Sequence, residues 1–432
     1  MTLNAYLVRA AWLGLVSLST ERASAQGDRP TPPAPAGTTG VVRAAAARSA
    51  PSTAEEPPAA PAGQGAPPSP EATPERGAVA APAAADAPPE PAPEFGGATF
   101  FDSPAGGHSQ GASLKLYGDT ELQAHHDDRW RANFATSHFE LFTSADVGRL
   151  SFLSELMFEG QGHEIAVDLD RTQLTYLFAN WLRVRAGRMH NAFGYYGDTY
   201  NHGNVYELTT SRPASIDEGG LLVPHVIGVA VDGTFDAGDI GSFSYDVQVA
   251  DGRSLTPPPS TSPYVPDYKL VNVRLRWLEP SGFIIGINAL RDAAPSSDLA
   301  DPPQTHVLEL CAGAHLDYLE HSYHVLVEAF AIRHESPRLA TTTTYGGFAE
   351  LGYQLGAFTP YVRPEWIRFP KTGDVLYQAA GSPYAGLRDH LDFRFGLRWQ
   401  PLVELALKVE GQRLSQDGAH QELATVKAAF GF

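Results

Sequence analysis

The chain has 432 residues, with 31 Lys and Arg against 49 Asp and Glu, which gives a formal net charge of −18 at pH 7. This acidic balance excludes a basic stripe for nucleic acid, because such binding neutralises phosphates with Lys and Arg. A single cysteine, Cys311, excludes an internal disulfide framework. No apolar run approaches about 18 residues, so no segment is predicted to cross a membrane as a helix.

The N-terminal segment has the pattern of a secretory signal. Arg9 precedes a short apolar stretch that ends near Leu18, and Ala23-Ser24-Ala25 forms a small-residue cleavage site before Gln26. The stretch is too short to span a membrane as a helix. We predict that residues 1–25 are a signal peptide. Any later membrane insertion would then use the strands of a barrel.

Residues 26–111 differ in composition from the rest of the chain, being rich in Ala, Pro, Gly and Ser. They show no sustained apolar periodicity, so they cannot bury enough apolar surface to fold. We predict a disordered segment, partly in the polyproline II conformation, that serves as a periplasmic linker. At about 3.1 Å per residue such a segment is long enough to act as a tether.

From residue 112 onward, apolar and polar residues alternate. In the stretch 242–251, Phe243, Tyr245 and Val247 alternate with Ser244 and Asp246, and the stretch 391–399 repeats the pattern. Alternation with period two places the two sets on opposite faces of a strand. Charges on the polar face would be costly in the core of a soluble sandwich. We therefore expect the apolar face on lipid and the charged face in a wet lumen.

The connections between these strands alternate in length. Short turns are predicted at 145–148, 179–180, 236–241, 278–282, 318–321, 355–357 and 400–401. Longer connections are predicted at 125–132, 159–163, 190–225, 251–266, 291–303, 335–341, 370–386 and 415–421. This pattern predicts an all-β, 16-stranded antiparallel transmembrane barrel over residues 112–432, with strands of about 10 residues and short turns on the periplasmic rim. Trp181, Trp277 and Trp399 lie near short turns and predict an aromatic girdle there.

The last strand ends on an aromatic residue. Its predicted outer face comprises Ala424, Val426, Ala428, Phe430 and Phe432. An aromatic C-terminus on an alternating strand is what an outer-membrane barrel presents to its assembly machinery. We predict that Phe432 is this signal.

The longest predicted loop follows the fifth strand and is the third external one. It contains AGRMHNAFGYYGDTYNHG (186–203) and TSRPASIDEGGLLVPH (210–225). A strand that ends in Gly-Arg before an aromatic, glycine-rich loop resembles outer-membrane porins related to the phosphate-selective (O/P-like) family. The resemblance covers the barrel and implies a homotrimeric porin whose third loop folds into the lumen. The loop lacks a cluster of basic residues, so the resemblance does not imply phosphate specificity.

The predicted pore lining combines basic residues of the wall with acidic residues of this loop. Arg183 and Arg185 alternate with apolar residues and should point into the lumen, and the broken alternation around Arg171 predicts a bulge. Such a pairing creates a transverse field that orients dipolar solutes. The alternative is that the charges pair with one another and keep the lumen wet. The predicted residues are Arg171, Arg183, Arg185, Arg188, Asp198, Glu207, Arg212, Asp217, Glu218, Arg274, Arg276, Arg394 and Arg398.

Motifs for other functions are absent from the sequence. It contains no G-x-S-x-G nucleophile elbow, no dinucleotide-binding fingerprint and no phosphate loop, so we expect neither an enzyme nor a cofactor. His125-His126-Asp127-Asp128 are neighbours in a loop and need not converge, so no metal site is predicted.

We therefore expect an outer-membrane porin for small hydrophilic solutes, in contact with lipid and lipopolysaccharide. The alternative is a non-conducting barrel that anchors the Pro-rich tether.

Overall fold

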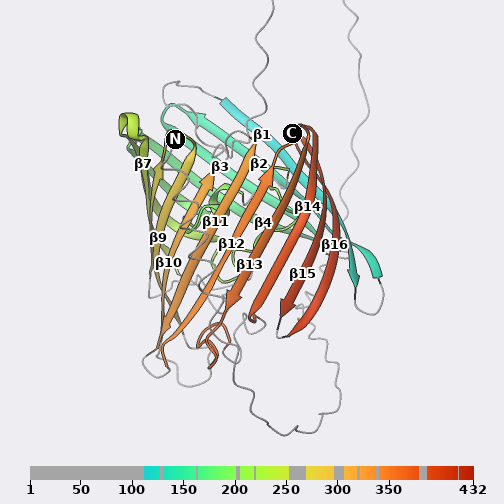
Figure 1. The fold of residues 1–432 in the computed structure, drawn as a ribbon. Coiled ribbons are helices and arrows are strands. Elements are labelled where there is room, and N and C mark those ends of the chain that lie inside the picture. Colours follow the sequence, from blue (N-terminus) through green and yellow to red (C-terminus); the bar gives the residue numbers. More distant parts are fainter. Residues whose placement is uncertain are drawn as a thin grey trace, which may run out of the picture. The chain divides into compact units, whose positions relative to one another are not determined.

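The computed structural model describes residues 111–432, with gaps at 127–129, 162–163, 201–204, 218–219, 253–268, 296–305, 319–321, 337–339, 379–386 and 417. The predicted signal peptide and all but the last residue of the predicted linker lie outside the described residues. Sixteen strands form one closed sheet, in which every strand pairs antiparallel with its chain neighbours and β1 pairs with β16 (Figure 1). The predicted 16-stranded antiparallel barrel is confirmed.

The first eight strands are β1 (Gly111–His126), β2 (Trp130–Val147), β3 (Leu150–Gln161), β4 (Glu164–Ala179), β5 (Leu182–His190), β6 (His225–Asp236), β7 (Ser242–Asp251) and β8 (Lys269–Leu278). The other eight are β9 (Phe283–Pro295), β10 (His306–Tyr318), β11 (Tyr323–Glu335), β12 (Thr342–Tyr353), β13 (Phe358–Arg368), β14 (His390–Leu402), β15 (Leu405–Gln416) and β16 (Ala419–Gly431). A short helix α2 (Tyr196–Thr199) follows β5, and a 3-10 turn η1 (Gly238–Ile240) joins β6 to β7.

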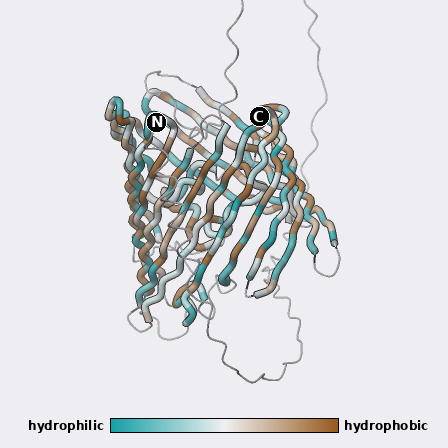
Figure 2. Tube along the Cα trace, viewed as in Figure 1, coloured by the Kyte–Doolittle hydropathy of each residue, from teal (hydrophilic) through white to brown (hydrophobic). Residues whose placement is uncertain are grey.

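The two faces of the barrel wall follow the alternation in the sequence. On β14, Phe393 and Phe395 are exposed on the outer face, whereas Asp392 and Arg394 are buried on the inner face. Apolar and polar residues also alternate along the other strands of the barrel (Figure 2). The burial pattern therefore gives the barrel an apolar outer surface and a polar inner wall, as predicted.

The seven short connections lie on one rim, which we call the short-turn rim. Each of them joins an even-numbered strand to the next strand, from β2 and β3 to β14 and β15. One predicted boundary is wrong, because Gln400 and Pro401 lie inside β14 and the turn is at 403–404. The pairing is irregular between Trp399 and Leu402, and such an irregularity lets a strand tolerate a proline.

Three connections on the opposite rim, the long-loop rim, are shorter than predicted. Only residues 127–129, 162–163 and 417–418 separate the strands there, so the long loops predicted at 125–132, 159–163 and 415–421 are mostly strand. The strands accordingly range from 9 to 18 residues instead of about 10. The apolar alternation fades before the backbone pairing ends, which is why the sequence placed these boundaries too early. Among the described residues no helix is long and apolar enough to cross a membrane.

The predicted bulge is present in β4. Glu155 pairs with Arg171 and Leu156 pairs with Leu169, so Asp170 is an extra residue opposite β3. Because a bulge shifts the alternation by one residue, Asp170 and Arg171 are both buried inside the barrel. The bulge therefore adds a carboxylate to the inner wall beside a basic residue.

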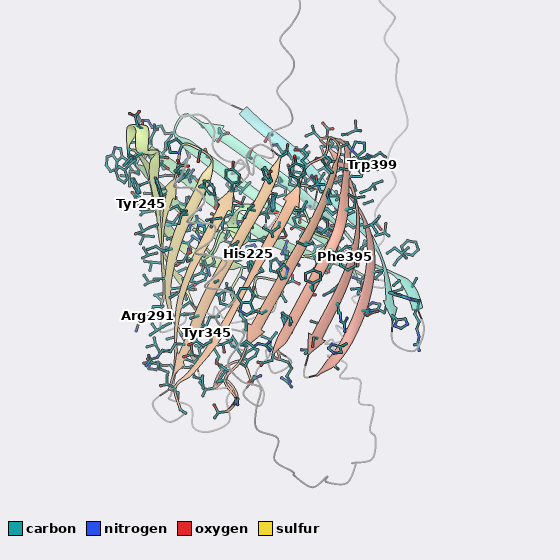
Figure 3. The ribbon with its side chains drawn as sticks, in the orientation of Figure 1. His225, Tyr245, Arg291, Tyr345, Phe395 and Trp399 are labelled. Carbon is teal, nitrogen blue, oxygen red and sulfur yellow. The ribbon has the colours of Figure 1, made fainter. Side chains whose placement is uncertain are left out.

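Aromatic side chains gather at the short-turn rim, as predicted from Trp181, Trp277 and Trp399. The Trp277 Nε1–H donates to the Ile240 carbonyl at 2.7 Å, and the Tyr245 hydroxyl donates to the Trp181 carbonyl at 2.8 Å. Tyr245 and Trp399 lie toward this rim, and Arg291 and Tyr345 lie toward the opposite one (Figure 3). Aromatic rings with one polar atom suit a boundary between lipid and water.

Candidate functional site: the barrel lumen and its inserted loop

The connection from β5 to β6, residues 191–224, folds into the barrel and is called the insertion loop. Phe193, Tyr196, Val205, Leu208 and Leu221 are buried although they belong to a connection. They pack against side chains from the inner faces of the strands. The prediction that the third external loop folds inward is confirmed.

The first arm of the insertion loop is bound by polar side chains of β7, β8 and β11. The Ala192 N–H donates to Gln248 Oε1 at 2.8 Å, and the N–H groups of Tyr195 and Tyr196 donate to Glu328 Oε1 at 2.8 and 2.5 Å. Gly194 has a φ of 80°, and a side chain at this position would overlap the Glu328 carboxylate. Glu328 therefore binds this arm of the loop, and the close contact requires glycine at position 194.

Helix α2 is held by Arg274 of β8, which is fully buried. Arg274 Nη1 donates to the Gly194 carbonyl at 2.9 Å, and its Nη2 lies 2.6 Å from Asp198 Oδ2 and 2.8 Å from Asp246 Oδ2. Burial raises the pKa of Asp198, but Arg274, His190 and Arg185 lower it more and hold it well below its usual range. Asp198 is therefore ionised and serves to fix the loop.

The tip of the insertion loop binds basic side chains of β13, β14 and β15. Arg398 Nη2 donates to the Val205 carbonyl, Lys408 Nζ to the Thr209 carbonyl, and Arg363 Nη1 to the Ser211 carbonyl, each at 2.7 Å. The Thr210 hydroxyl donates to Glu410 Oε1, also at 2.7 Å. These contacts hold the tip against the wall opposite the point where the loop leaves β5.

The tip also reaches the short-turn rim. Val205 packs with Tyr117, Ala406 and Ala429, which lie near the short-turn ends of β1, β15 and β16. The Tyr206 ring lies 6.0 Å from the Tyr117 ring, centroid to centroid. The insertion loop therefore runs along the lumen instead of forming a ring at one level.

A second connection enters the lumen, and the sequence did not indicate it. In the connection between β13 and β14, predicted as an external loop, Leu376 and Tyr377 are fully buried. They join Leu221 and inward-facing apolar residues of β6 to β13 in one core. The expectation of a wet lumen is wrong for this part of the barrel, which is packed like a protein interior.

The inner faces of β3 to β6, which we call the open wall, carry two charged side chains that solvent reaches. The Asp168 side chain is 59% exposed and the Arg183 side chain 31% exposed. Other charged side chains of the open wall are more covered, since those of Arg171 and Arg185 are only 9% and 11% exposed. Along β7 to β15 nearly all inward side chains are buried, and Glu155, Asp170 and Asp232 of β3, β4 and β6 are buried as well. Asp168 and Arg183 therefore mark the part of the open wall that solvent reaches.

The predicted wall arginines have carboxylate partners. Arg183 and Arg185 share Asp232, each at 2.6 Å, and Arg171 lies 2.7 Å from Glu155. Further ion pairs join Arg185 to Asp246 at 3.0 Å, Arg276 to Asp246 at 3.6 Å, Arg394 to Asp392 at 2.9 Å and Arg394 to Glu410 at 3.2 Å. The alternative that the charges pair with one another therefore describes much of this wall.

Arg188 differs from the other predicted arginines. It is in phase with Val184 and Ala186 and not with Arg183 and Arg185, its Nε donates to the Asp170 carbonyl at 2.7 Å, and its Nη2 lies 3.8 Å from Asp168 Oδ2. Arg188 therefore stabilises the backbone of the bulge in β4.

The predicted loop charges are not gathered at one point. Asp217 is exposed, Arg212 is partly buried, and Glu207 is buried near Lys408. Glu218 lies outside the described residues. Burial raises the pKa of Glu207, and Lys408 and Arg212 oppose this rise without cancelling it. Asp217 is therefore the described acidic residue of the loop that solvent reaches most easily.

Several residues that organise the lumen were not predicted. Asp232, Asp246 and Glu328 were recognisable as inward-facing polar residues, but their partners depend on the register between strands and on the path of the loop. Within the described part of the chain, no group of three or more His, Cys, Asp or Glu side chains is placed to hold a metal ion.

Comparison with known proteins shows a likeness of structure alone. No family model matches the sequence, and no curated protein matches it. The anion-selective porin from Comamonas acidovorans is similar with a TM-score of 0.54 and 11% identity, over 75% of this chain and 100% of that one. The trimer form of OmpT from Vibrio cholerae gives a TM-score of 0.51 and 11% identity, over 75% and 100% of the two chains. Salmonella typhi OmpF gives 0.50 and 13%, over 75% and 98%. The chain therefore has the closed barrel fold of these outer-membrane proteins.

Proposed function

We propose that the protein is an outer-membrane porin, through which small hydrophilic solutes or ions diffuse passively along the open wall. The observation that carries this proposal is the uneven burial of the inner wall. Asp168 on β4 and Arg183 on β5 keep contact with solvent, whereas charged side chains such as Arg274, Arg363 and Lys408 on β8, β13 and β15 are fully buried. A polar path lined by fixed charges suits hydrophilic solutes.

The outer surface supports a location in a lipid bilayer. Leu174, Val229, Ile287 and Phe395 are exposed on the outer face of the sheet. A closed barrel leaves no unpaired strand edge, so it satisfies its backbone hydrogen bonds within the membrane. We therefore propose the outer membrane as the site of the barrel, with the segment before it in the periplasm.

Contacts with other molecules follow from this location. The barrel would contact lipid and lipopolysaccharide, and Phe432 would be read by the barrel assembly machinery. The homotrimer and the relation to phosphate-selective porins rest on the resemblance of the insertion loop. The wall arginines are paired with carboxylates, so the described lumen offers no reason to assign phosphate specificity.

A non-conducting anchor is the second candidate, and the packed lumen favours it. Arg274, Arg363 and Lys408 are fully buried under the insertion loop, which leaves little of the lumen free on that side. The two candidates differ in whether the open wall conducts.

Single-channel recording in a planar bilayer tests the proposal. Purified, refolded protein should give discrete openings, whereas an electrically silent barrel would support the anchor. Excision of Tyr200–Leu208 should raise the conductance, because the tip would no longer occupy the lumen. Excision of residues 254–262, from the connection between β7 and β8, is the control of equal length and should change it little. Unchanged conductance after the first excision would exclude the insertion loop from the pore.

The orientation is tested with epitope tags on intact cells. A tag near Ser260 or Ser382 should be accessible to antibody, because these positions lie in connections of the long-loop rim. A tag at 236–241, on the short-turn rim, should not be accessible. The reverse result would place the barrel upside down and reject the proposed periplasmic side.

A further inference from the structure

The second inserted segment, residues 369–378, is called the latch segment. Its described contacts are as specific as those of the insertion loop. The Asp374 Oδ1 accepts the N–H groups of Leu376 and Tyr377 at 2.9 and 3.0 Å. Its Oδ2 accepts the hydroxyls of Thr342 and Thr344 of β12, both at 3.1 Å. A fully satisfied buried carboxylate of this kind fixes the backbone around it.

A buried histidine joins the latch segment to two further strands. His334 of β11 lies with Nδ1 2.7 Å from Asp374 Oδ1 and with Nε2 2.9 Å from Glu309 Oε2 of β10. All three side chains are buried. The latch segment is therefore bound to β10 and β11 through one imidazole between two carboxylates, and to β12 through two threonine hydroxyls.

Tyr377 connects the latch segment to the insertion loop. Its hydroxyl lies 2.8 Å from the Leu221 carbonyl and 2.9 Å from Glu309 Oε2. Its ring packs edge-on against His334, with 4.7 Å between the centroids. Tyr377 and Leu221 are both fully buried, so the hydroxyl cannot exchange this contact for water while the segments stay in place.

Leu221 lies in the arm that returns to the open wall. This arm ends at His225, the first residue of β6, whose Nε2 is 3.2 Å from Asp170 Oδ1. Asp170 is the bulge residue next to Arg171, a buried arginine of the open wall. A contact at Leu221 is therefore four residues away from His225, whose side chain binds the open wall.

We propose that the latch segment holds the returning arm of the insertion loop in place through Tyr377, so that its release widens the passage along the open wall. This inference rests on the proposed porin function for its effect on conductance. The contact between the latch segment and the returning arm is a property of the fold, and it can be tested by a measurement that does not need conduction.

Labelling of the single cysteine can report whether the latch segment stays in place. Cys311, the single cysteine, is buried on the inner face of β10, in the same apolar core as Leu221, Leu376 and Tyr377. A water-soluble maleimide should label it slowly in the folded full-length protein. If the latch opens, the rate should rise, because labelling needs the core to separate from the wall.

The test variant is Tyr377→Phe, which removes the hydroxyl and keeps the ring. We expect labelling of Cys311 to become about ten-fold faster, since loss of one to two buried hydrogen bonds shifts a local opening by roughly that factor. Single-channel conductance should rise or fluctuate between levels. The control is Tyr345→Phe, an exposed tyrosine on the outer face of β12, which should leave both readouts unchanged.

A second variant, Asp374→Asn, removes the negative charge that binds His334 and the N–H groups of Leu376 and Tyr377. Both variants must keep the mobility of the folded, unheated barrel on gels, which the conservative Tyr377→Phe change should do in any case. Labelling as slow as that of the wild type in both variants would overturn the latch. Faster labelling with a silent channel would keep the latch and reject the porin, so the two failures are distinguishable.

Discussion

At the scale of single residues, the open wall is a set of arginines that share few carboxylates. Asp232 lies between Arg183 and Arg185, and Asp246 accepts from Arg185 and from Arg274. Arg274 also pairs with Asp198, and Arg276 lies 3.6 Å from Asp246, so three carboxylates serve four arginines and leave a positive excess at this part of the inner wall. Of the four arginines, Arg183 reaches solvent most, so it should have the largest influence on permeating ions.

The first prediction is that Arg183→Gln shifts ion selectivity toward cations. We expect a change of about two-fold in the permeability ratio at low salt, because a fixed charge acts strongly in a narrow, poorly screened passage. Arg185→Gln should act in the same direction but less. The effect should shrink at 1 M salt, where the Debye length is about 3 Å.

Reversal potentials in a salt gradient measure this shift. Arg291→Gln is the matched control, because Arg291 is exposed on the outer face of β9. An equal shift in the control would show that the effect does not arise in the lumen.

The second prediction compares two neighbouring arginines of β8. Arg274→Met should lower the free energy of unfolding by about 3–5 kcal/mol, because Asp198 and Asp246 would lose a buried partner. Arg276→Met should cost about 1 kcal/mol or less, since the Arg276 side chain is 17% exposed and lies 3.6 Å from Asp246. Denaturant unfolding of the refolded barrel measures both. Equal losses would show that the buried contacts of Arg274 are not what stabilises the loop.

At the scale of elements, the latch segment should respond to acid. Burial raises the pKa of Asp374, but the His334 imidazole and the N–H groups of Leu376 and Tyr377 lower it more, so the net pKa lies below its usual value. A carboxylate with a lowered pKa stabilises the folded state above the unfolded pKa, and this stabilisation is lost as pH falls through the folded pKa.

The third prediction is therefore that the latch holds from neutral pH down to about pH 4 and weakens only below it. The groups that face Asp374 are His334 of β11 and Glu309 of β10, which touches His334, while Thr342 and Thr344 of β12 do not titrate.

Single-channel conductance against pH provides the measurement. The wild type should show a rise below about pH 4, and Asp374→Asn should lose this rise because it starts unlatched. Asp239→Asn, in the turn between β6 and β7, should keep the wild-type profile. A rise that persists in Asp374→Asn would assign the acid response to other carboxylates of the lumen.

The elements also show what the sequence could and could not predict. Period-two alternation identified the inner and outer faces, and the broken alternation around Arg171 identified the bulge, because both depend on neighbouring residues. The latch segment was missed because Leu376 and Tyr377 form no periodic pattern. Their burial depends on contacts with Leu221 and Glu309, which are far away in the sequence.

The same distinction applies to the predicted site. Alternation puts Arg183 and Arg185 on one face of β5, where both contact Asp232, whereas Arg188 is in phase with Val184 and Ala186 and contacts the Asp170 carbonyl instead. The acidic loop residues could be recognised as part of an insertion. Their partners, such as Arg274 for Asp198, required the path of the loop in three dimensions.

At the scale of the whole molecule, the C-terminus closes the barrel. The Phe432 N–H donates to the Leu116 carbonyl at 2.8 Å, and the Leu116 N–H donates to the Phe432 carbonyl at 2.9 Å. The Phe432 side chain is exposed on the outer surface beside Phe430. Deletion of Phe432 would remove both the ring and this pair of backbone bonds, so a substitution separates the two contributions better.

The fourth prediction is that Phe432→Ala lowers the amount of barrel in the outer membrane several-fold, while molecules that do insert keep the wild-type conductance. The backbone pair with Leu116 remains, so the loss would report recognition of the ring. Leu402→Ala, at an exposed apolar position on the same rim, is the control. Quantitative blotting of membrane fractions measures the effect, and equal levels in the two variants would show that the ring is not a signal.

The contacts of the insertion loop tip also set the order of assembly. Val205 binds Arg398, Thr209 binds Lys408, and Thr210 binds Glu410, at separations of 193, 199 and 200 residues. Contacts this distant in sequence form late, because the chain between them must first be ordered. The tip therefore has no binding surface until β14 and β15 have joined the sheet. A newly closed barrel must pass through a stage with an unfilled interior, and seating of the tip is the step that ends its maturation.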